Sequence, residues 1–133
     1  MIGALYRGLT RLAEPLVTPF LPADRREPLP RVAGGAWCHA ASAGEVRGVV
    51  TLARRGAAHG PVLLTAQTAA GVSAARRLLP EAAVRRARLD FPGAVAAAVR
   101  QADPGLYVLA ETELWPNLLD ALARAGVPRV LVN

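Results

Sequence analysis

From residue 36 onward, short apolar runs alternate with longer segments in which apolar residues recur every three or four positions. The short runs are apolar throughout, which predicts buried β-strands, and they span residues 36–40, 61–66, 83–89, 105–110 and 127–132. The longer segments predict helices at 44–58, 69–79, 92–101 and 114–125. Strands that alternate with helices over short connections are typical of parallel β/α units. The pattern therefore predicts an α/β fold with a Rossmann-like, doubly wound parallel sheet.

Residues 1–29 are expected to form an amphipathic helix and linker ahead of a sheet domain at 30–133. Apolar residues recur at helical spacing from Ile2 to Val17, and Pro15 predicts that the helix ends near Glu14. Residues 22–35 are rich in Pro, Gly and charge, as linkers are. The helix is too short and too charged to cross a bilayer. It is expected either to lie on a membrane surface or to pack against the domain.

Composition narrows the classes of function. The 133 residues are 53% hydrophobic, which favours one folded domain, and a single Cys38 excludes a disulfide scaffold. All 16 basic residues are Arg. Residues 1–100 contain 14 of them and 6 acidic residues, whereas residues 101–133 contain 2 Arg and 4 acidic residues, so the positive charge lies in the first part of the chain. Arginines on solvent-exposed helix faces are the simplest explanation of this excess of positive charge, and binding of an anionic partner is the alternative.

Other site classes lack their sequence signals. Only two residues each of Tyr, Phe and Trp are present, so nucleic-acid binding would depend on Arg alone. No metal-ligand spacing, Gly-x-Gly-x-x-Gly or Walker sequence occurs. We therefore expect no metal, no cofactor and no nucleic-acid partner.

The segment from His39 to Glu45 follows the first predicted strand, at the edge where parallel sheets bind ligands. Ser42 can cap the next helix, and Glu45 three residues later completes a capping box. Alternatively, Glu45 is a general base at the mouth of a cleft, with its charge favoured by the helix dipole, and Gly44 lets a ligand approach the backbone. Spacing leaves both interpretations open, and His39 fits a strand-end residue as well as a catalytic one.

The segment Thr65–Gly71 follows the second predicted strand and again offers hydroxyl groups before a helix. Thr68 is most simply an ordinary helix cap.

The segment Glu111–Asn117 (ETELWPN) follows the fourth predicted strand and is the sharpest signal in the chain. Helix capping accounts for one carboxylate and for Pro, but not for Trp115 and Asn117 as well. Glu111 and Glu113 could position hydroxyl groups or raise each other's pKa.

Taken in this order, the three motifs resemble those of the Kdo (3-deoxy-D-manno-octulosonic acid) transferases, glycosyltransferase family 30. That family's Trp-x-His-Ala-x-Ser-x-Gly-Glu segment reads Trp37 to Glu45 here, and its Glu-Thr-Glu-Leu-Trp-Pro-Asn segment is intact. Its Thr-rich segment is matched at Thr65, Thr68 and Gly71, with Ala70 replacing a Thr. Of its Tyr-x-Pro-x-Asp stretch only Asp90 remains, behind Arg86 and Arg88. The resemblance covers about residues 30–133.

The resemblance implies the N-terminal, acceptor-binding half of a GT-B glycosyltransferase that transfers Kdo from CMP-Kdo to a lipid A precursor in lipopolysaccharide biosynthesis. It implies that Glu45 is the base that deprotonates the acceptor hydroxyl. The other acceptor-binding or active-site residues would be Ser42, Gly44, Thr68, Gly71, Glu111, Glu113, Trp115 and Asn117. It also implies a peripheral location at the cytoplasmic face of the inner membrane, with residues 1–20 as a weakened anchor.

The CMP-Kdo domain of that family is expected to be absent from this chain. Alone, the chain would be inactive, as a fragment, a split subunit or a degenerate gene product. The alternative is a non-catalytic Rossmann-like module that binds anionic lipid or glycolipid.

Overall fold

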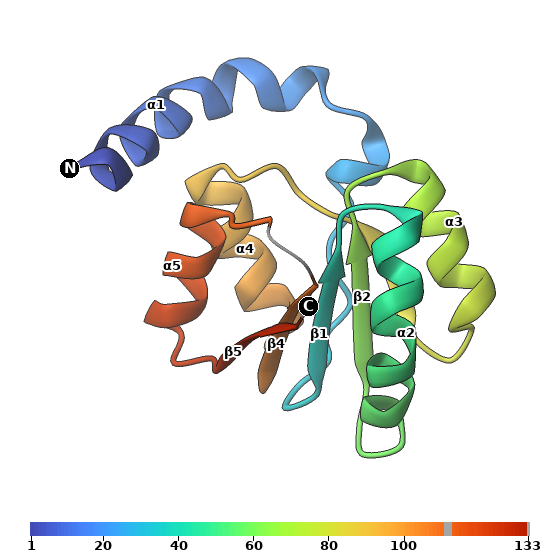
Figure 1. The fold of residues 1–133 in the computed structure, drawn as a ribbon. Coiled ribbons are helices and arrows are strands. Elements are labelled where there is room, and N and C mark those ends of the chain that lie inside the picture. The colour runs from blue at the N-terminus through green and yellow to red at the C-terminus, as the bar shows by residue number, and fades with distance from the viewer. Residues whose placement is uncertain (111–112, 133) are drawn as a thin grey trace.

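Five parallel strands form one sheet in the order β3-β2-β1-β4-β5. This computed structural model describes residues 1–110 and 113–132. The strands are β1 (Ala36–Ala40), β2 (Val62–Ala66), β3 (Ala83–Arg86), β4 (Leu106–Ala110) and β5 (Arg129–Val132). The chain winds outward from β1 to β3 and then returns to place β4 on the other side of β1 (Figure 1). The prediction of a Rossmann-like, doubly wound parallel sheet is confirmed.

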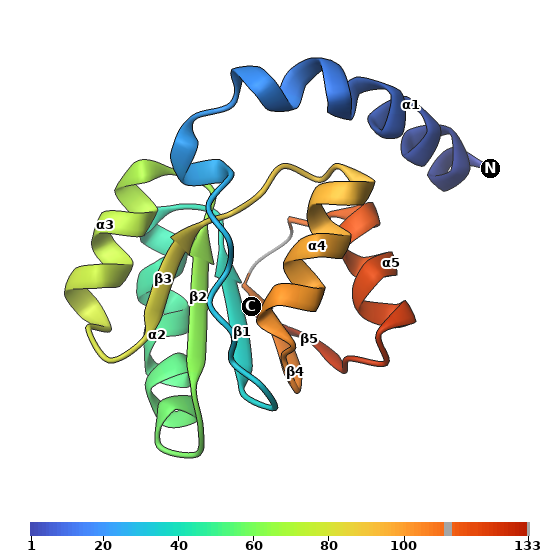
Figure 2. The same ribbon diagram turned by 180° about the vertical axis from the view of Figure 1, so that it is seen from behind.

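Two helices cover each face of the sheet, as Figures 1 and 2 show from opposite sides. They are α2 (Ala43–Ala57) and α3 (Ala69–Leu78) on one face, and α4 (Pro92–Ala102) and α5 (Pro116–Arg124) on the other. Side chains alternate between the faces, so that Cys38 and Leu64 belong to one apolar cluster while Trp37 and Tyr107 belong to the other. Burial on both faces explains why the strands are apolar throughout.

The N-terminal helix α1 (Ile2–Val17) is longer than predicted and continues into a 3₁₀ turn at Thr18–Phe20. An interior Pro costs a helix about 3 kcal/mol, which is why an end near Glu14 was expected. That expectation is wrong because a tertiary contact fixes this turn. Glu14 accepts hydrogen bonds from the backbone N–H groups of Gly93 and Ala94, at 2.9 and 2.7 Å, at the N-terminus of α4.

The segment predicted as a linker lies against the sheet domain. It contains a 3₁₀ turn at Ala23–Arg25, and its Leu29 and Val32 are buried in the apolar cluster on the α4 and α5 side. The backbone N–H of Val32 donates to the carbonyl of Ala102 at 2.8 Å. Apolar side chains therefore anchor a segment whose Pro, Gly and charged residues had suggested a free connection.

Candidate active site

The strand order reverses between β1 and β4, and ligands of doubly wound sheets bind where such a reversal occurs, at the carboxyl ends of the strands. The loops that follow these two strands carry two of the sequence motifs. The fold therefore brings the His39–Glu45 segment and the described part of the Glu111–Asn117 segment to one edge. Glu111 and Thr112 lie outside the described residues.

The β1 loop caps the start of α2. Ser42 is the N-cap of α2, and its Oγ accepts from the backbone N–H of Glu45 at 3.5 Å. Glu45 reaches back, and its Oε2 accepts from the backbone N–H of Ala41 at 2.6 Å. Ser42 therefore caps α2 as predicted, but the return bond from Glu45 goes to Ala41 N–H rather than to the N–H of Ser42, as a capping box requires, and it occupies one carboxylate oxygen.

Glu45 also lines an open groove of about 330 Å³. The groove lies between α2 and the ends of β4 and β5, and its walls are Glu45, Gly48, Thr51, Leu52, Arg55, Ala110 and Val132. Gly44 leaves room beside it, because the nearest atom to a Cβ built there would be Ser42 Oγ at 3.8 Å. A carboxylate at the rim of a groove with free space beside it can meet a hydroxyl group of a ligand.

Glu113 lies across the switch point from His39. Its Oε2 is 3.9 Å from Nε2 of His39, whose side chain is only 2% exposed. His39 Nδ1 is 3.0 Å from Thr65 Oγ1, and the indole N–H of Trp37 donates to the same oxygen at 2.9 Å. The sequence motifs named Trp37, His39 and Thr65 but did not show that these residues meet. The register of β1 and β2, which pairs His39 with Thr65, is the signal that connects them.

The His39 imidazole lowers the pKa of Glu113, against the opposing effect of burial, and the Trp115 indole adds a smaller effect in the direction of His39. Of the two roles expected for the pair, a raised pKa does not hold for Glu113, whereas the positioning of hydroxyl groups stays a prediction. Trp115 itself is the N-cap residue of α5 and packs against the apolar cluster below.

The two predicted site residues of the β2 loop, Thr68 and Gly71, have structural roles. Thr68 is the N-cap of α3, and its Oγ1 accepts from the backbone N–H of Gly71 at 3.0 Å. A Cβ on Gly71 would lie 2.9 Å from the Cβ of Ala66 and 3.1 Å from Oγ1 of Thr68. Close packing of α3 onto the sheet thus requires glycine here.

Asn117 is 4% exposed, and its side chain is used inside the fold. Its Nδ2 donates to the backbone carbonyl of Asp90 at 2.6 Å and to Thr10 Oγ1 of α1 at 2.9 Å. The Asp90 carboxylate accepts from the backbone N–H groups of Asn117 and Leu118, at 3.0 and 2.8 Å, and from the hydroxyl of Tyr6 at 3.0 Å. Asp90 therefore caps α5 from a distant loop and binds α1 to it.

Comparison with known proteins decides the family. The family model described as "3-Deoxy-D-manno-octulosonic-acid transferase (kdotransferase)" matches residues 10–133, which include all three edge motifs. The chain belongs to the Kdo transferase family. A 3-deoxy-D-manno-octulosonic acid transferase of Bordetella pertussis is 40% identical over 119 residues, covering 84% of this chain and 27% of that protein. One of Haemophilus influenzae is 30% identical over 103 residues, covering 74% of this chain and 24% of that protein. The chain spans about a quarter of the length of these relatives.

Several arginines of this Kdo transferase chain hold the segment before β1 rather than facing solvent. Arg25 and Arg86 both donate to the backbone carbonyl of Gln67, at 2.9 and 3.1 Å, and Arg86 also pairs with Asp24 at 3.1 Å. Arg88 donates to the backbone carbonyl of Glu27 at 2.8 Å. Arg86 and Arg88, which depart from the family pattern, therefore have a structural role. Part of the basic excess is internal.

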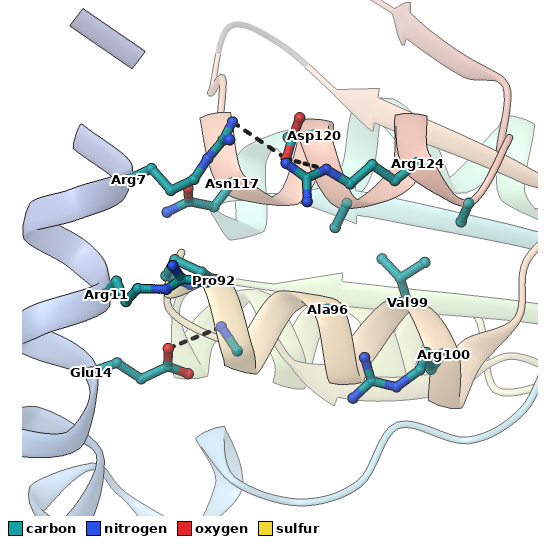
Figure 3. Close-up of a pocket in the computed structure, with 13 residues that line it drawn as sticks. Arg7, Arg11, Glu14, Pro92, Ala96, Val99, Arg100, Asn117, Asp120 and Arg124 are labelled. Atoms are coloured by element: carbon teal, nitrogen blue, oxygen red, sulfur yellow. Dashed lines mark hydrogen bonds and ion pairs between the residues drawn. The ribbon is translucent and has the colours of Figure 1, made fainter. Parts of the chain in front are cut away.

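A second groove, of about 530 Å³, lies between α1, α4 and α5 (Figure 3). Four arginines line it: Arg7 and Arg11 from α1, Arg100 from α4 and Arg124 from α5. Arg7 and Arg124 share Asp120, at 3.3 and 2.9 Å, whereas Arg11 and Arg100 make no ion pair with a described residue. This groove is the positively charged part of the α1 side of the molecule.

Helix α1 packs its polar face against the domain and exposes its apolar face, whereas an ordinary surface helix buries its apolar face. Tyr6, Thr10 and Glu14 hold it to the domain through hydrogen bonds. Its apolar side chains point away and are 60–84% exposed, namely Ile2, Leu5, Leu9, Leu12 and Leu16. Among the helices described, none is both long enough and apolar enough to cross a membrane. The helix thus packs against the domain and still presents an apolar ridge, here defined by those five residues.

Proposed function

We propose that this chain is the acceptor-binding part of a GT-B glycosyltransferase that transfers Kdo from CMP-Kdo to a lipid A precursor. The observation that supports the proposal best is that the Glu45 groove and the Glu113 loop both lie at the carboxyl ends of β1 and β4, in a chain of the Kdo transferase family. The donor nucleotide would be bound by residues outside these 133. The acceptor hydroxyl would enter beside Gly44.

Glu45 is the proposed general base. The carboxylate takes the proton of the acceptor hydroxyl while that oxygen forms a bond to the anomeric carbon of Kdo, and CMP leaves with the electron pair of the bond that breaks. Glu45 Oε2 is held by Ala41 N–H, which fixes the orientation of the carboxylate and leaves the other oxygen for the hydroxyl. Glu113 is the proposed partner for a second acceptor hydroxyl.

The test uses a chimera in which residues 10–133 replace the matched part of the Bordetella pertussis enzyme. Transfer of Kdo from CMP-Kdo to a lipid A precursor is measured by mass spectrometry. Glu45→Gln keeps an oxygen for Ala41 N–H but removes the base, so the fold should be retained while transfer falls by about 10²-fold or more. Glu81→Gln, which alters an exposed carboxylate paired with Arg54, is the matched control and should remain within about twofold of the parent.

Two results would contradict the proposal. A Glu45→Gln chimera as active as its parent would remove Glu45 from the role of base. A folded chimera that binds CMP-Kdo but transfers no Kdo would contradict the assignment of the acceptor domain. Binding of lipid A by that inactive chimera would favour the non-catalytic lipid-binding module.

We also propose that the apolar ridge lies on the cytoplasmic face of the inner membrane. Hydrogen bonds occupy the inner face of α1, so its leucines have no partner among the described residues, and the arginine groove beside it suits an anionic surface. Co-sedimentation with phosphatidylglycerol vesicles should fall about tenfold or more in Leu9→Ser/Leu12→Ser. Leu131→Ser, which alters an exposed leucine of β5 that lines neither groove, should bind like the parent. Equal binding by all three proteins would exclude the ridge as the contact.

A further inference from the structure

Two buried polar atoms face each other across the switch point. Neither His39 Nε2 nor Glu113 Oε2 has a hydrogen-bond partner among the described residues, and 3.9 Å separates them. A buried carboxylate oxygen without a donor is unfavourable, because it has lost its water and gained no hydrogen bond. The separation exceeds an ordinary hydrogen bond, but the Glu113 side chain is 38% exposed and is free to close the gap. If His39 carries a hydrogen on Nε2, that nitrogen can donate to Glu113 Oε2, and each atom gains the hydrogen-bond partner that it lacks.

The hydrogen bonds of Trp37 and Thr65 determine which nitrogen of His39 carries the ring hydrogen. The indole N–H of Trp37 can only donate, and it donates to Thr65 Oγ1. The Thr65 hydroxyl keeps its own hydrogen, which can be donated to His39 Nδ1 at 3.0 Å. A neutral ring that accepts at Nδ1 carries its hydrogen on Nε2, directed at Glu113. The opposite arrangement would set an Nε2 lone pair against a carboxylate, or would need a charged ring at a fully buried position.

We propose that Trp37, Thr65 and His39 form a chain of donors that positions Glu113 at the edge of the sheet. In this series of hydrogen bonds each of the three residues donates one hydrogen to the next group, and none of the three carries a charge. One Glu113 oxygen is held inward and the rest of the carboxylate is left for a ligand. His39 is then a positioning residue. That the ligand is the acceptor hydroxyl rests on the function proposed above.

Among residues 1–110 and 113–132, no other charged group takes the place of Glu113. Arg88 and Asp90 line the small cavity beside His39, but the Asp90 oxygens accept from α5 and Tyr6, and Arg88 donates to Glu27 and Gln101. The other ionisable neighbours in the described part of the chain are the thiol of Cys38 and the hydroxyl of Tyr107, and burial raises the pKa of each, so both stay neutral at pH 7. The lowered pKa of Glu113 has the direction that a donor at His39 Nε2 produces.

The first test is made on the 133-residue chain by NMR. Long-range ¹H–¹⁵N spectra should show His39 as the neutral tautomer protonated at Nε2 near pH 7. Thr65→Val, which removes the hydroxyl at nearly constant shape, should shift that tautomer balance, and Thr65→Ser should restore it. A wild-type ring protonated at Nδ1 would overturn the proposal without the need for any variant to fold.

The second test follows Glu113 itself through the ¹³C shift of its carboxyl carbon. The wild-type midpoint should lie below the ordinary value of 4.5. His39→Leu should raise it, whereas His39→Gln, whose amide can donate from a similar position, should keep it low. An unchanged midpoint in a folded His39→Leu chain would overturn the proposal.

The chimera separates positioning from stability. His39→Leu should raise the KM for the acceptor about tenfold, the equivalent of about 1.4 kcal/mol, and leave the KM for CMP-Kdo unchanged, while His39→Gln restores the acceptor KM. An unchanged acceptor KM in an active chimera would overturn the positioning role. An inactive parent chimera would instead count against the proposed function, and the NMR results would still decide the donor chain.

Discussion

Replacing Asp90 with Asn should destabilise the fold by about 2–4 kcal/mol, although it changes a single atom. One carboxylate oxygen accepts from Asn117 N–H and the Tyr6 hydroxyl, and the other accepts from Leu118 N–H. An amide must place its NH₂ group against at least one of these donors. The less costly choice gives up the Leu118 bond, worth about 1.5–3 kcal/mol because the acceptor is charged. Loss of a negative charge at the N-terminus of α5 adds about 0.3–1 kcal/mol.

Urea unfolding at pH 7, followed by far-UV circular dichroism, measures this free energy directly. The melting temperature should fall by roughly 6–20 °C, at about 3–5 °C per kcal/mol for a domain of this size. The matched control is Asp103→Asn. Asp103 ends α4 at φ 47°, which Asn also adopts, and it makes only an exposed pair with Arg31, so the change should stay within about 0.5 kcal/mol. If Asp90→Asn cost no more than this control, the capping of α5 by Asp90 would be refuted.

Three further predictions use other features of the fold. Gly71→Ala should cost about 1–3 kcal/mol because of its close contacts, whereas Gly44→Ala should be neutral or stabilising by up to about 1 kcal/mol, in the same urea assay; equal effects would contradict the packing argument. Burial and Asp90 raise the pKa of Tyr6 to about 12, so the folded state holds its proton longer than the unfolded state and stability should fall from pH 10 to 12. The fall should be smaller in Tyr6→Phe, where Cys38 and Tyr107 still contribute to it, and an equal fall in both proteins would contradict the role of Tyr6. Burial raises the pKa of Cys38 to about 11, so a thiol reagent at pH 8 should react with it much faster in 6 M guanidinium than in buffer, and equal rates would show an open strand.

The alternation of strands and helices could be predicted because each element's own apolar spacing encodes it. The register of β1 against β2 then sets His39 opposite Thr65, but a sequence motif names both residues without pairing them. The role of Asp90 was out of reach for another reason. Its partners Asn117 and Leu118 are 27 and 28 residues away, and only the fold makes them neighbours.

Local rules failed where a distant contact outweighed them. Pro15 is a valid local signal for the end of a helix, yet α1 continues because Glu14 is fixed by the first N–H groups of α4. The charge of Arg86 and Arg88 was visible in the composition, but their partners lie in the segment before β1. Composition could not show which arginines would be left for an anionic ligand.

The contacts of α1 connect the apolar ridge with the loop that carries Glu113. Tyr6 belongs to the helix that carries the apolar ridge, and it donates to the same Asp90 oxygen that accepts from the start of α5. Glu113 stands four residues before Asn117, ahead of that helix. A displacement of α1 would therefore reach the base of the Glu113 loop through the Asp90 carboxylate and through the Asn117 side chain, which donates to Thr10 of α1. The position of α1 and the position of the Glu113 loop are therefore mechanically coupled.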